Sequence, residues 1–174
     1  MIADVPVARE LVVSADGVAL SVPTEADRRL LAAGGDGAYQ VDRDARPLPY
    51  PPFGGALIVI DEATGAVLGD VSWHATFYGP SVSCMAWNVG IDLLPSARGR
   101  GVGAVAQRLL VGYLFASTDV DRVEASTDVT NLAGQRALER AGFRKEGVAR
   151  GAQVRGGVRH DLVLYGVLRT DVSG

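Results

Sequence analysis

Apolar and polar side chains alternate at every second position through the middle of this 174-residue chain. Period two over many positions is typical of β-strands, and it predicts strands over 56–61, 66–77 and 83–94. One face of each strand should meet the core while the other carries polar groups. Those polar positions are Asp70, Ser72, His74 and Thr76 in the second of these strands, and Asn88 and Asp92 in the third.

After residue 94 the period lengthens to that of a helix. Apolar side chains between Val102 and Leu114 recur at spacings of three and four, which predicts an amphipathic helix of about four turns. Asn131 is placed to cap a further helix that ends at Ala141, and Gly142 follows as its stop.

The remaining segments complete an order ββ-α-βββ-α-β-α-ββ. This order predicts the α+β class, with a mixed, mostly antiparallel sheet and helices packed on it. Residues 36–55 contain four prolines and no period, and we interpret them as a loop on the substrate side. The other predicted elements are strands over 10–13 and 18–22, a helix over 26–33 that starts at Thr24, a strand over 122–127, and closing strands over 143–149 and 161–169 joined by a loop rich in Gly and Arg.

Composition predicts one compact domain spanning residues 1–174. The chain is 48% hydrophobic and 21% charged, which is the profile of a globular protein. One cysteine and two histidines exclude a disulfide framework and leave little for a metal site. No apolar run approaches the roughly 20 residues of a membrane helix, and the N-terminus lacks the pattern of a signal peptide. We therefore expect a cytoplasmic protein without a metal and without a membrane partner.

Charge is divided unevenly between the two halves of the chain. Residues 1–97 hold 5 Lys and Arg against 12 Asp and Glu, whereas residues 98–174 hold 12 against 8. An acidic half beside a basic half suits a protein that binds a cationic and an anionic ligand together. The net charge of −3 and the absence of a basic stripe with aromatic residues disfavour nucleic acid as a partner.

The segment PSARGRGVGA joins the third strand of the meander to the long helix. Its glycines, Gly99, Gly101 and Gly103, permit positive φ and bring backbone N–H groups close to a ligand. Those groups lie at a helix N-terminus, which favours an anion, and Arg98 and Arg100 add donors suited to phosphate. The loop therefore predicts a pyrophosphate site, although no Gly-Lys-Ser/Thr follows as a P-loop requires.

A dinucleotide-binding loop is the alternative for the same glycines. Residues 101–106 satisfy a relaxed form of that fingerprint, with acidic residues downstream at Asp121 and Glu124. That motif follows its strand by a tight turn within a parallel array, whereas several residues intervene here and an antiparallel meander precedes. Binding of NAD is thus the disfavoured interpretation.

Two motifs resemble those of the GNAT (Gcn5-related) N-acetyltransferases. Residues 98–103, RGRGVG, match the Arg/Gln-x-x-Gly-x-Gly/Ala loop that binds the pyrophosphate of acetyl-CoA in that superfamily. Residues 131–143, NLAGQRALERAGF, are similar to its second motif, which starts with Asn and ends with Gly-Phe. The resemblance covers roughly residues 56–169 and is closest to the branch of ribosomal-protein N-terminal acetyltransferases.

The resemblance implies a GNAT fold with helices on both faces and acetyl-CoA as co-substrate. The strand at 89–94 would splay from the strand at 122–127, and the pantetheine arm would fill the gap. Backbone groups there would pair with the arm, and one N–H would polarise the thioester carbonyl. The cofactor-binding residues so implied are Leu93, Leu94, Arg98, Gly99, Arg100, Gly101, Val102, Gly103, Ala104 and Asn131.

The amine in such a reaction attacks the thioester directly, after a base has taken its proton. Asp92 is the first candidate base, because its setting Gly-Ile-Asp is similar to that of the acidic residue in aminoglycoside 6′-N-acetyltransferases; Glu124 and His74 follow. Leu138 stands where many family members have the tyrosine that protonates the leaving thiolate. Tyr165 is the substitute candidate acid, and Asp92→Asn is expected to lower kcat/KM without changing acetyl-CoA affinity.

The resulting hypothesis is an acetyl-CoA-dependent transferase that acts on a primary amine, which the acidic first half of the chain predicts to be cationic. A protein N-terminus, an aminoglycoside-like or natural-product amine and a polyamine all remain candidates. The rival from another class is an acyl-CoA-binding sensor without turnover, and a homodimer is expected from the relatives.

Overall fold

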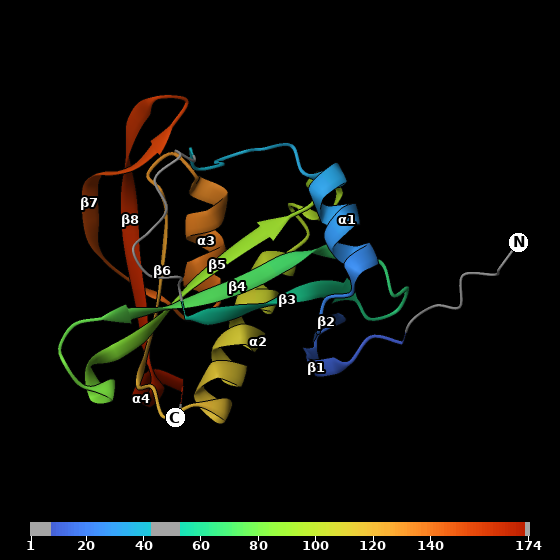
Figure 1. Ribbon diagram of the computed structural model, residues 1–174, viewed down its shortest axis with the longest axis horizontal. Helices are drawn as coiled ribbons and strands as arrows, with labels where there is room; N and C mark the ends of the chain where they lie inside the picture. The colour runs from blue at the N-terminus through green and yellow to red at the C-terminus, as the bar shows by residue number, and fades with distance from the viewer. Residues whose placement is uncertain (1–7, 43–52, 173–174) are drawn as a thin grey trace, which may run out of the picture.

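The computed structural model describes residues 8–42 and 53–172, and its elements follow the predicted order (Figure 1). Two short 3₁₀ helices, Val82–Cys84 and Pro95–Ala97, flank β5. The elements are β1 (Leu11–Ala15), β2 (Val18–Ser21), α1 (Glu25–Gly34), β3 (Gly54–Asp61), β4 (Val67–Phe77), β5 (Met85–Leu93), α2 (Val102–Ser117), β6 (Arg122–Asp128), α3 (Leu132–Arg140), β7 (Arg144–Arg155), β8 (Val158–Leu168) and α4 (Arg169–Val172).

The eight strands form one sheet in the order β1-β2-β3-β4-β5-β6-β8-β7. Every neighbouring pair is antiparallel except β5 and β6, which are parallel and are connected through α2. This arrangement confirms the predicted α+β class with a mixed, mostly antiparallel sheet. It also places the one parallel pair directly beside the glycine loop that leads into α2.

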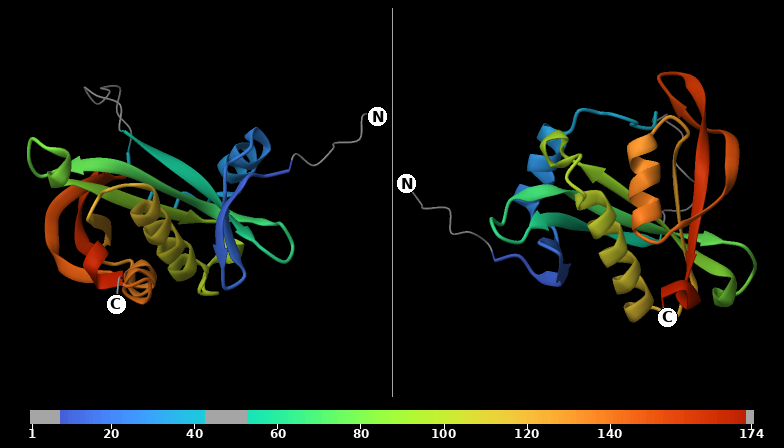
Figure 2. Two further views of the ribbon diagram at one scale, coloured as in Figure 1. Left: turned by 90° about the horizontal axis from the view of Figure 1, so that it is seen from below. Right: turned by 180° about the vertical axis from the view of Figure 1, so that it is seen from behind.

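Helices cover both faces of the sheet, as Figure 2 shows in the view from below. Helices α2 and α3 pack on one face, where the main core includes Val71, Val89 and Leu110. Helix α1 packs on the opposite face, where Leu31 contacts Ile58 and its buried neighbours. No helix in the described part of the chain is long and apolar enough to cross a membrane.

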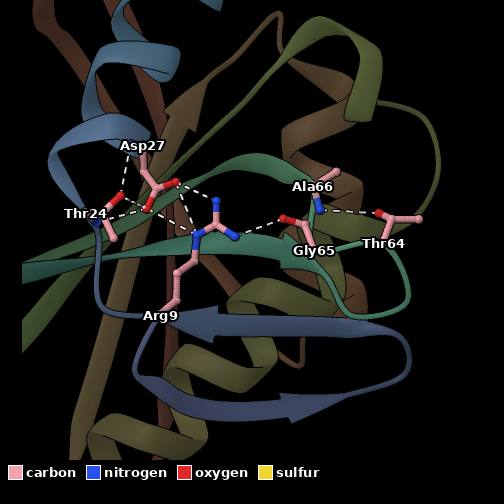
Figure 3. Close-up of polar contacts among 6 residues, drawn as sticks. All are labelled: Arg9, Thr24, Asp27, Thr64, Gly65 and Ala66. Atoms are coloured by element: carbon pink, nitrogen blue, oxygen red, sulfur yellow. Dashed lines mark hydrogen bonds and ion pairs between the residues drawn. The ribbon is translucent and has the colours of Figure 1, made fainter. Parts of the chain in front are cut away.

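The start of α1 is held by a buried carboxylate, shown in Figure 3. Thr24, the predicted start of this helix, forms a capping box with Asp27, in which each side chain accepts from the other's backbone N–H. Arg9 donates to Asp27 at 2.8 Å and to the carbonyl of Gly65 at 3.0 Å. The guanidinium thereby connects α1 to the turn between β3 and β4, and it lowers the pKa of Asp27 to about 2.

Residues 35–42, which we name the strap, cross the sheet from the end of α1 toward the β7–β8 hairpin (Figure 1). At one end Asp36 accepts two hydrogen bonds from Arg98. At the other end Asp42 accepts from the N–H groups of Gly156 and Gly157, at 2.9 and 2.8 Å. The segment expected to be a single long loop therefore begins with an anchored crossing, and its residues 43–52 lie outside the described residues.

The prediction of a loop between the last two strands is wrong. Residues 150–160 continue β7 and β8 as a long hairpin, and Arg155 pairs with Val158 at its tip. Gly156 and Gly157 both adopt positive φ, 55° and 75°, as a tight two-residue hairpin turn requires. The Gly and Arg residues obscured the alternation, because this hairpin extends past the core and has no apolar face to reveal it.

Candidate active site

The parallel strands β5 and β6 separate partway along their length. Their pairing includes Trp87 with Val123, Asn88 with Glu124 and Val89 with Ala125. Beyond these three pairs β5 runs on to Leu93 and β6 to Asp128 without pairing to each other. The ends of the two strands therefore border a gap in the sheet, between the first turns of α2 and α3.

The backbone of β5 presents hydrogen-bonding groups to this gap. The N–H of Leu94 donates to the carbonyl of Leu68 in β4 at 2.9 Å, and the carbonyl of Leu94 accepts from the N–H of Ala97. Because backbone groups of successive residues point to opposite edges of a strand, those of Ile91 and Leu93 point toward β6. Of the two predicted residues, Leu94 has both backbone groups paired, and Leu93 keeps its N–H for the gap while its carbonyl accepts from Arg98. The backbone groups of Ile91, which was not predicted, also point into the gap.

The glycine loop reaches α2 through two residues in the left-handed region. Gly99 has φ 74° and Gly101, the N-cap, has φ 82°, a conformation that glycine adopts at little cost. The first N–H groups of a helix have no acceptor within it, and the first backbone bond here is donated by Ala104 to the carbonyl of Gly101. The N–H groups of Val102 and Gly103 precede this bond and can donate to an anion, whereas that of Ala104 is already paired. The pyrophosphate site itself stays a prediction.

The two arginines of the loop have acidic partners. The guanidinium of Arg98 donates to both carboxylate oxygens of Asp36, at 2.6 and 2.9 Å, and its Nε donates to the carbonyl of Leu93 at 3.0 Å. Arg100 is exposed and lies 3.8 Å from Asp61. In this structure Arg98 connects the strap to the end of β5 and its guanidinium is occupied, whereas the pair of Arg100 with Asp61 is beyond hydrogen-bond distance and leaves the Arg100 guanidinium exposed.

Asn131 caps α3 through its side-chain amide. Its Oδ1 accepts from the N–H of Gly134 at 3.0 Å, and its Nδ2 donates to Thr127 at 2.9 Å. A Cβ added at Gly134 would lie 2.6 Å from Nδ2 of Asn131 and 2.8 Å from Thr127 Oγ1. The absence of a side chain at Gly134 therefore leaves room for the two side chains that form this cap.

Gly134→Ala should consequently destabilise the protein, although alanine ordinarily stabilises a helix relative to glycine. The added methyl group displaces the side chain of Asn131 and removes a cap worth about 1 kcal/mol. We expect the free energy of unfolding to fall by roughly 1–2 kcal/mol in urea denaturation. Gly112→Ala, in a helical position with open space, is the matched control, and a stabilised Gly134→Ala would contradict this explanation.

A row of three side chains crosses the polar face where the strands separate. His74 is paired with Asn88 and Asn88 with Glu124, so the three project from the same face. Glu124 is only 8% exposed. Its Oε2 accepts from Tyr78 at 2.5 Å and from Arg122 at 3.4 Å, while Oε1 accepts, among residues 8–42 and 53–172, from Asn88 alone, at 3.2 Å. Oε1 therefore keeps the capacity to accept a further hydrogen bond.

Asp92 lies on the same face nearer the open end of the gap. Its side chain is 72% exposed and lies 3.8 Å from Arg98. Its cross-strand neighbour is Asp70, which borders a cavity of about 230 Å³ beneath α1. Burial, and secondarily the charge of Asp92, raises the pKa of Asp70 to about 6. The sequence did not predict Asp70 as a site residue. Alternation of polar and apolar positions places it on the polar face of β4, but does not show that α1 covers its side chain there.

The raised pKa of Asp70 gives a testable dependence of stability on pH. Since the folded protein disfavours the carboxylate, ionisation costs stability as the pH rises from the ordinary value of 3.8 toward 6, and the full cost applies above that. Asp70→Asn should raise the free energy of unfolding by roughly 1 kcal/mol at pH 8. Thermal unfolding should show no such gain at pH 4, and an equal gain at both values would disprove ionisation as the cause.

Tyr165, the candidate acid, is buried at 1% exposure in the main core. Its hydroxyl donates to Glu139 of α3 at 3.1 Å, and burial together with this carboxylate raises its pKa above the ordinary value of 10. The side chain belongs to the packing between β8 and α3. Its catalytic role stays a prediction that this placement does not favour.

The residues described so far define a class of protein. It is an α+β protein that offers a helix N-terminus to an anionic group and, next to it, a gap between two strands to an extended chain. A carboxylate, Glu124, stands where that gap closes.

Comparison with known proteins identifies the family. The model for the acetyltransferase (GNAT) domain matches residues 23–144, and the chain belongs to this family. The chain is 37% identical over 83 residues to "Probable N-acetyltransferase YjcK" of Bacillus subtilis, a match that covers 48% of this chain and 46% of that protein. The chain thus matches about half the length of this curated relative.

Two solved structures share the fold over most of the chain. One is a ribosomal-protein-S5-alanine acetyltransferase from Vibrio fischeri, with a TM-score of 0.71, 17% identity, and coverage of 93% of this chain and 98% of that one. The other is RimJ of Mycobacterium smegmatis in complex with CoA-disulfide, with a TM-score of 0.68, 16% identity, and coverage of 95% and 88%. Both support the predicted GNAT fold.

Proposed function

We propose that this protein is an acetyl-CoA-dependent N-acetyltransferase that acts on a primary amine. The observation that carries the proposal is the separation of β5 from β6 beside the glycine loop. Its neighbour in fold, RimJ of Mycobacterium smegmatis, is described with CoA-disulfide, which supports a CoA thioester as the ligand of this gap.

The residues around the gap fit such a co-substrate. The backbone N–H groups at the start of α2, those of Val102 and Gly103, would hold the pyrophosphate. Ile91 and Leu93 would hold the extended arm through backbone groups that point into the gap, and one N–H there would polarise the thioester carbonyl. Acetyl-CoA supplies the acetyl group as a thioester, so no nucleophilic side chain is required.

Glu124 is the base that the geometry favours over Asp92. It is buried where the gap closes, is held in one orientation by three donors, and retains acceptor capacity at Oε1. Its carboxylate would take one proton from the ammonium of the acceptor. The nitrogen lone pair then forms the bond to the acetyl carbon, the carbon–sulfur bond breaks, and the sulfur takes a second proton. The products are the amide and the CoA thiol, with one proton released.

A turnover assay tests this function against the sensor hypothesis. The protein is incubated with acetyl-CoA and a panel of primary amines that includes a polyamine, an aminoglycoside and peptides with a free N-terminus. Release of CoA thiol in proportion to amine concentration is expected for at least one of them. Tight binding of acetyl-CoA without amine-dependent release would favour a sensor.

A further inference from the structure

A second cavity lies on the polar face at the closed end of the gap. It has a volume of about 510 Å³ and lies between the β4–β5 connection and the starts of β6 and β7. It is open to solvent, and a hollow of this volume can admit a small organic molecule. Its lining combines apolar and charged groups: Tyr78, Ser83, Cys84, Met85, Asp121, Arg122 and Glu146.

The cavity is connected directly to Glu124. Tyr78, which is 65% exposed, donates its hydroxyl to Glu124 at 2.5 Å. Arg122 donates to Glu124 at 3.4 Å and to both oxygens of Glu146, at 2.8 and 2.5 Å. A ligand that occupies the cavity therefore contacts two side chains that hold the candidate base in place.

The charges around the cavity do not balance. Arg122 is shared between two carboxylates, Glu124 and Glu146, while Asp121 has its own partner in Arg169. These five groups sum to one excess negative charge. A ligand with one ammonium group would balance that charge. The ring of Tyr78, which Arg122 covers at 5.8 Å, and the side chain of Met85 both line the cavity and suit an apolar stem on the same molecule.

The strap and the cavity lie at opposite ends of the gap, so an amine can reach the polar face through the cavity without passing the strap. Helices α2 and α3 cover the opposite face, and the strap crosses the open end of the gap on the polar face, from Arg98 to the tip of the β7–β8 hairpin (Figure 1). The cavity lies at the other end of β5 and β6. A CoA arm that enters at the open end and an amine that enters at the closed end would meet beside Glu124.

We propose that this cavity is the acceptor site and that it takes a primary ammonium carried on an apolar stem, with Glu146 and Tyr78 as its specificity-determining residues. The proposal rests on the proposed transferase function for its catalytic meaning. The preference for a cation is a property of the cavity alone, and it can be measured without turnover.

The experiment uses a single thiol as a reporter in the cavity. Cys84 is the only cysteine of the chain, so Ser83→Cys in a Cys84→Ala background puts one thiol at an exposed position in the lining. The probes are 2-aminoethyl methanethiosulfonate, which is cationic, and 2-sulfonatoethyl methanethiosulfonate, which is anionic. Ala33→Cys in the same background, on exposed α1, is the matched control.

The cationic reagent should be favoured over the anionic one about tenfold more at position 83 than at position 33, because the local field is negative. Glu146→Gln should reduce this preference at position 83 and leave that at position 33 unchanged. Equal preference at both positions, or no effect of Glu146→Gln, would overturn the acceptor site.

The modified protein supplies the second readout. Aminoethylation at position 83 should raise the KM for the amine by at least about tenfold, while calorimetry shows unchanged affinity for acetyl-CoA. An unchanged amine KM would disprove the site even if the enzyme is active. If no amine is turned over, the transferase function fails, yet the reagent preference still decides whether the cavity selects a cation.

Discussion

Gly101→Glu should weaken acetyl-CoA binding by at least about 100-fold, which corresponds to about 2.7 kcal/mol. The substitution places a carboxylate among the N–H groups that would hold the pyrophosphate, and like charges repel there. It also forces a residue with a side chain to φ 82°, at a cost of roughly 1–2 kcal/mol. Isothermal titration with acetyl-CoA measures the effect directly.

The fold should survive this change, because open space surrounds a Cβ at Gly101. Gly112→Glu is the matched control, since it adds the same charge to an exposed position of the same helix, also in open space. The control should bind acetyl-CoA as the natural protein does. Equal loss in both variants would mean that net charge, and not the loop, governs binding.

Glu124→Gln should lower kcat/KM for the amine by about 10²- to 10⁴-fold, the usual contribution of a general base. The amide keeps the shape of the carboxylate, but it has one acceptor oxygen where Glu124 uses two to accept from Tyr78 and Asn88, and it cannot take a proton. Acetyl-CoA affinity should stay unchanged, because Glu124 faces away from the helices that cover the gap. Steady-state kinetics and calorimetry together separate the two effects.

Asp92→Asn is the informative comparison for this variant. Asp92 is largely exposed and lies near Arg98, so its loss should change kcat/KM by less than about tenfold under this mechanism. Glu62→Gln, at an exposed carboxylate that accepts from Ser14, controls for the loss of one charge. If Asp92→Asn lowered kcat/KM strongly and Glu124→Gln lowered it little, Asp92 and not Glu124 would be the general base.

The elements of the sheet were predictable because each strand of the meander has one face in the core. Burial of Val71 and Val89 imposes a period of two, which the sequence displays directly. The start of α1 was equally visible, because the capping box of Thr24 and Asp27 is a local pattern. The glycines of the loop were predictable for the same reason: positive φ at Gly99 and Gly101 is a local requirement.

Contacts between distant segments could not be predicted in this way. Arg98 pairs with Asp36, 62 positions earlier, and nothing in either local sequence marks them as partners. The position of Ile91 in the gap depends on which backbone groups β4 already occupies, which is a matter of register. Tyr78 and Arg122 meet Glu124 only because β4, β5 and β6 are neighbours in the sheet.

Titration of the purified protein with acetyl-CoA, with NAD in parallel, decides whether the glycine loop binds a CoA thioester or a dinucleotide. The structure predicts micromolar binding of acetyl-CoA that is lost in Gly101→Glu and retained in Gly112→Glu, with no heat from NAD. Binding of NAD with no response to acetyl-CoA would contradict the account, because the glycine loop would then hold a dinucleotide and the gap beside it would have no acyl donor.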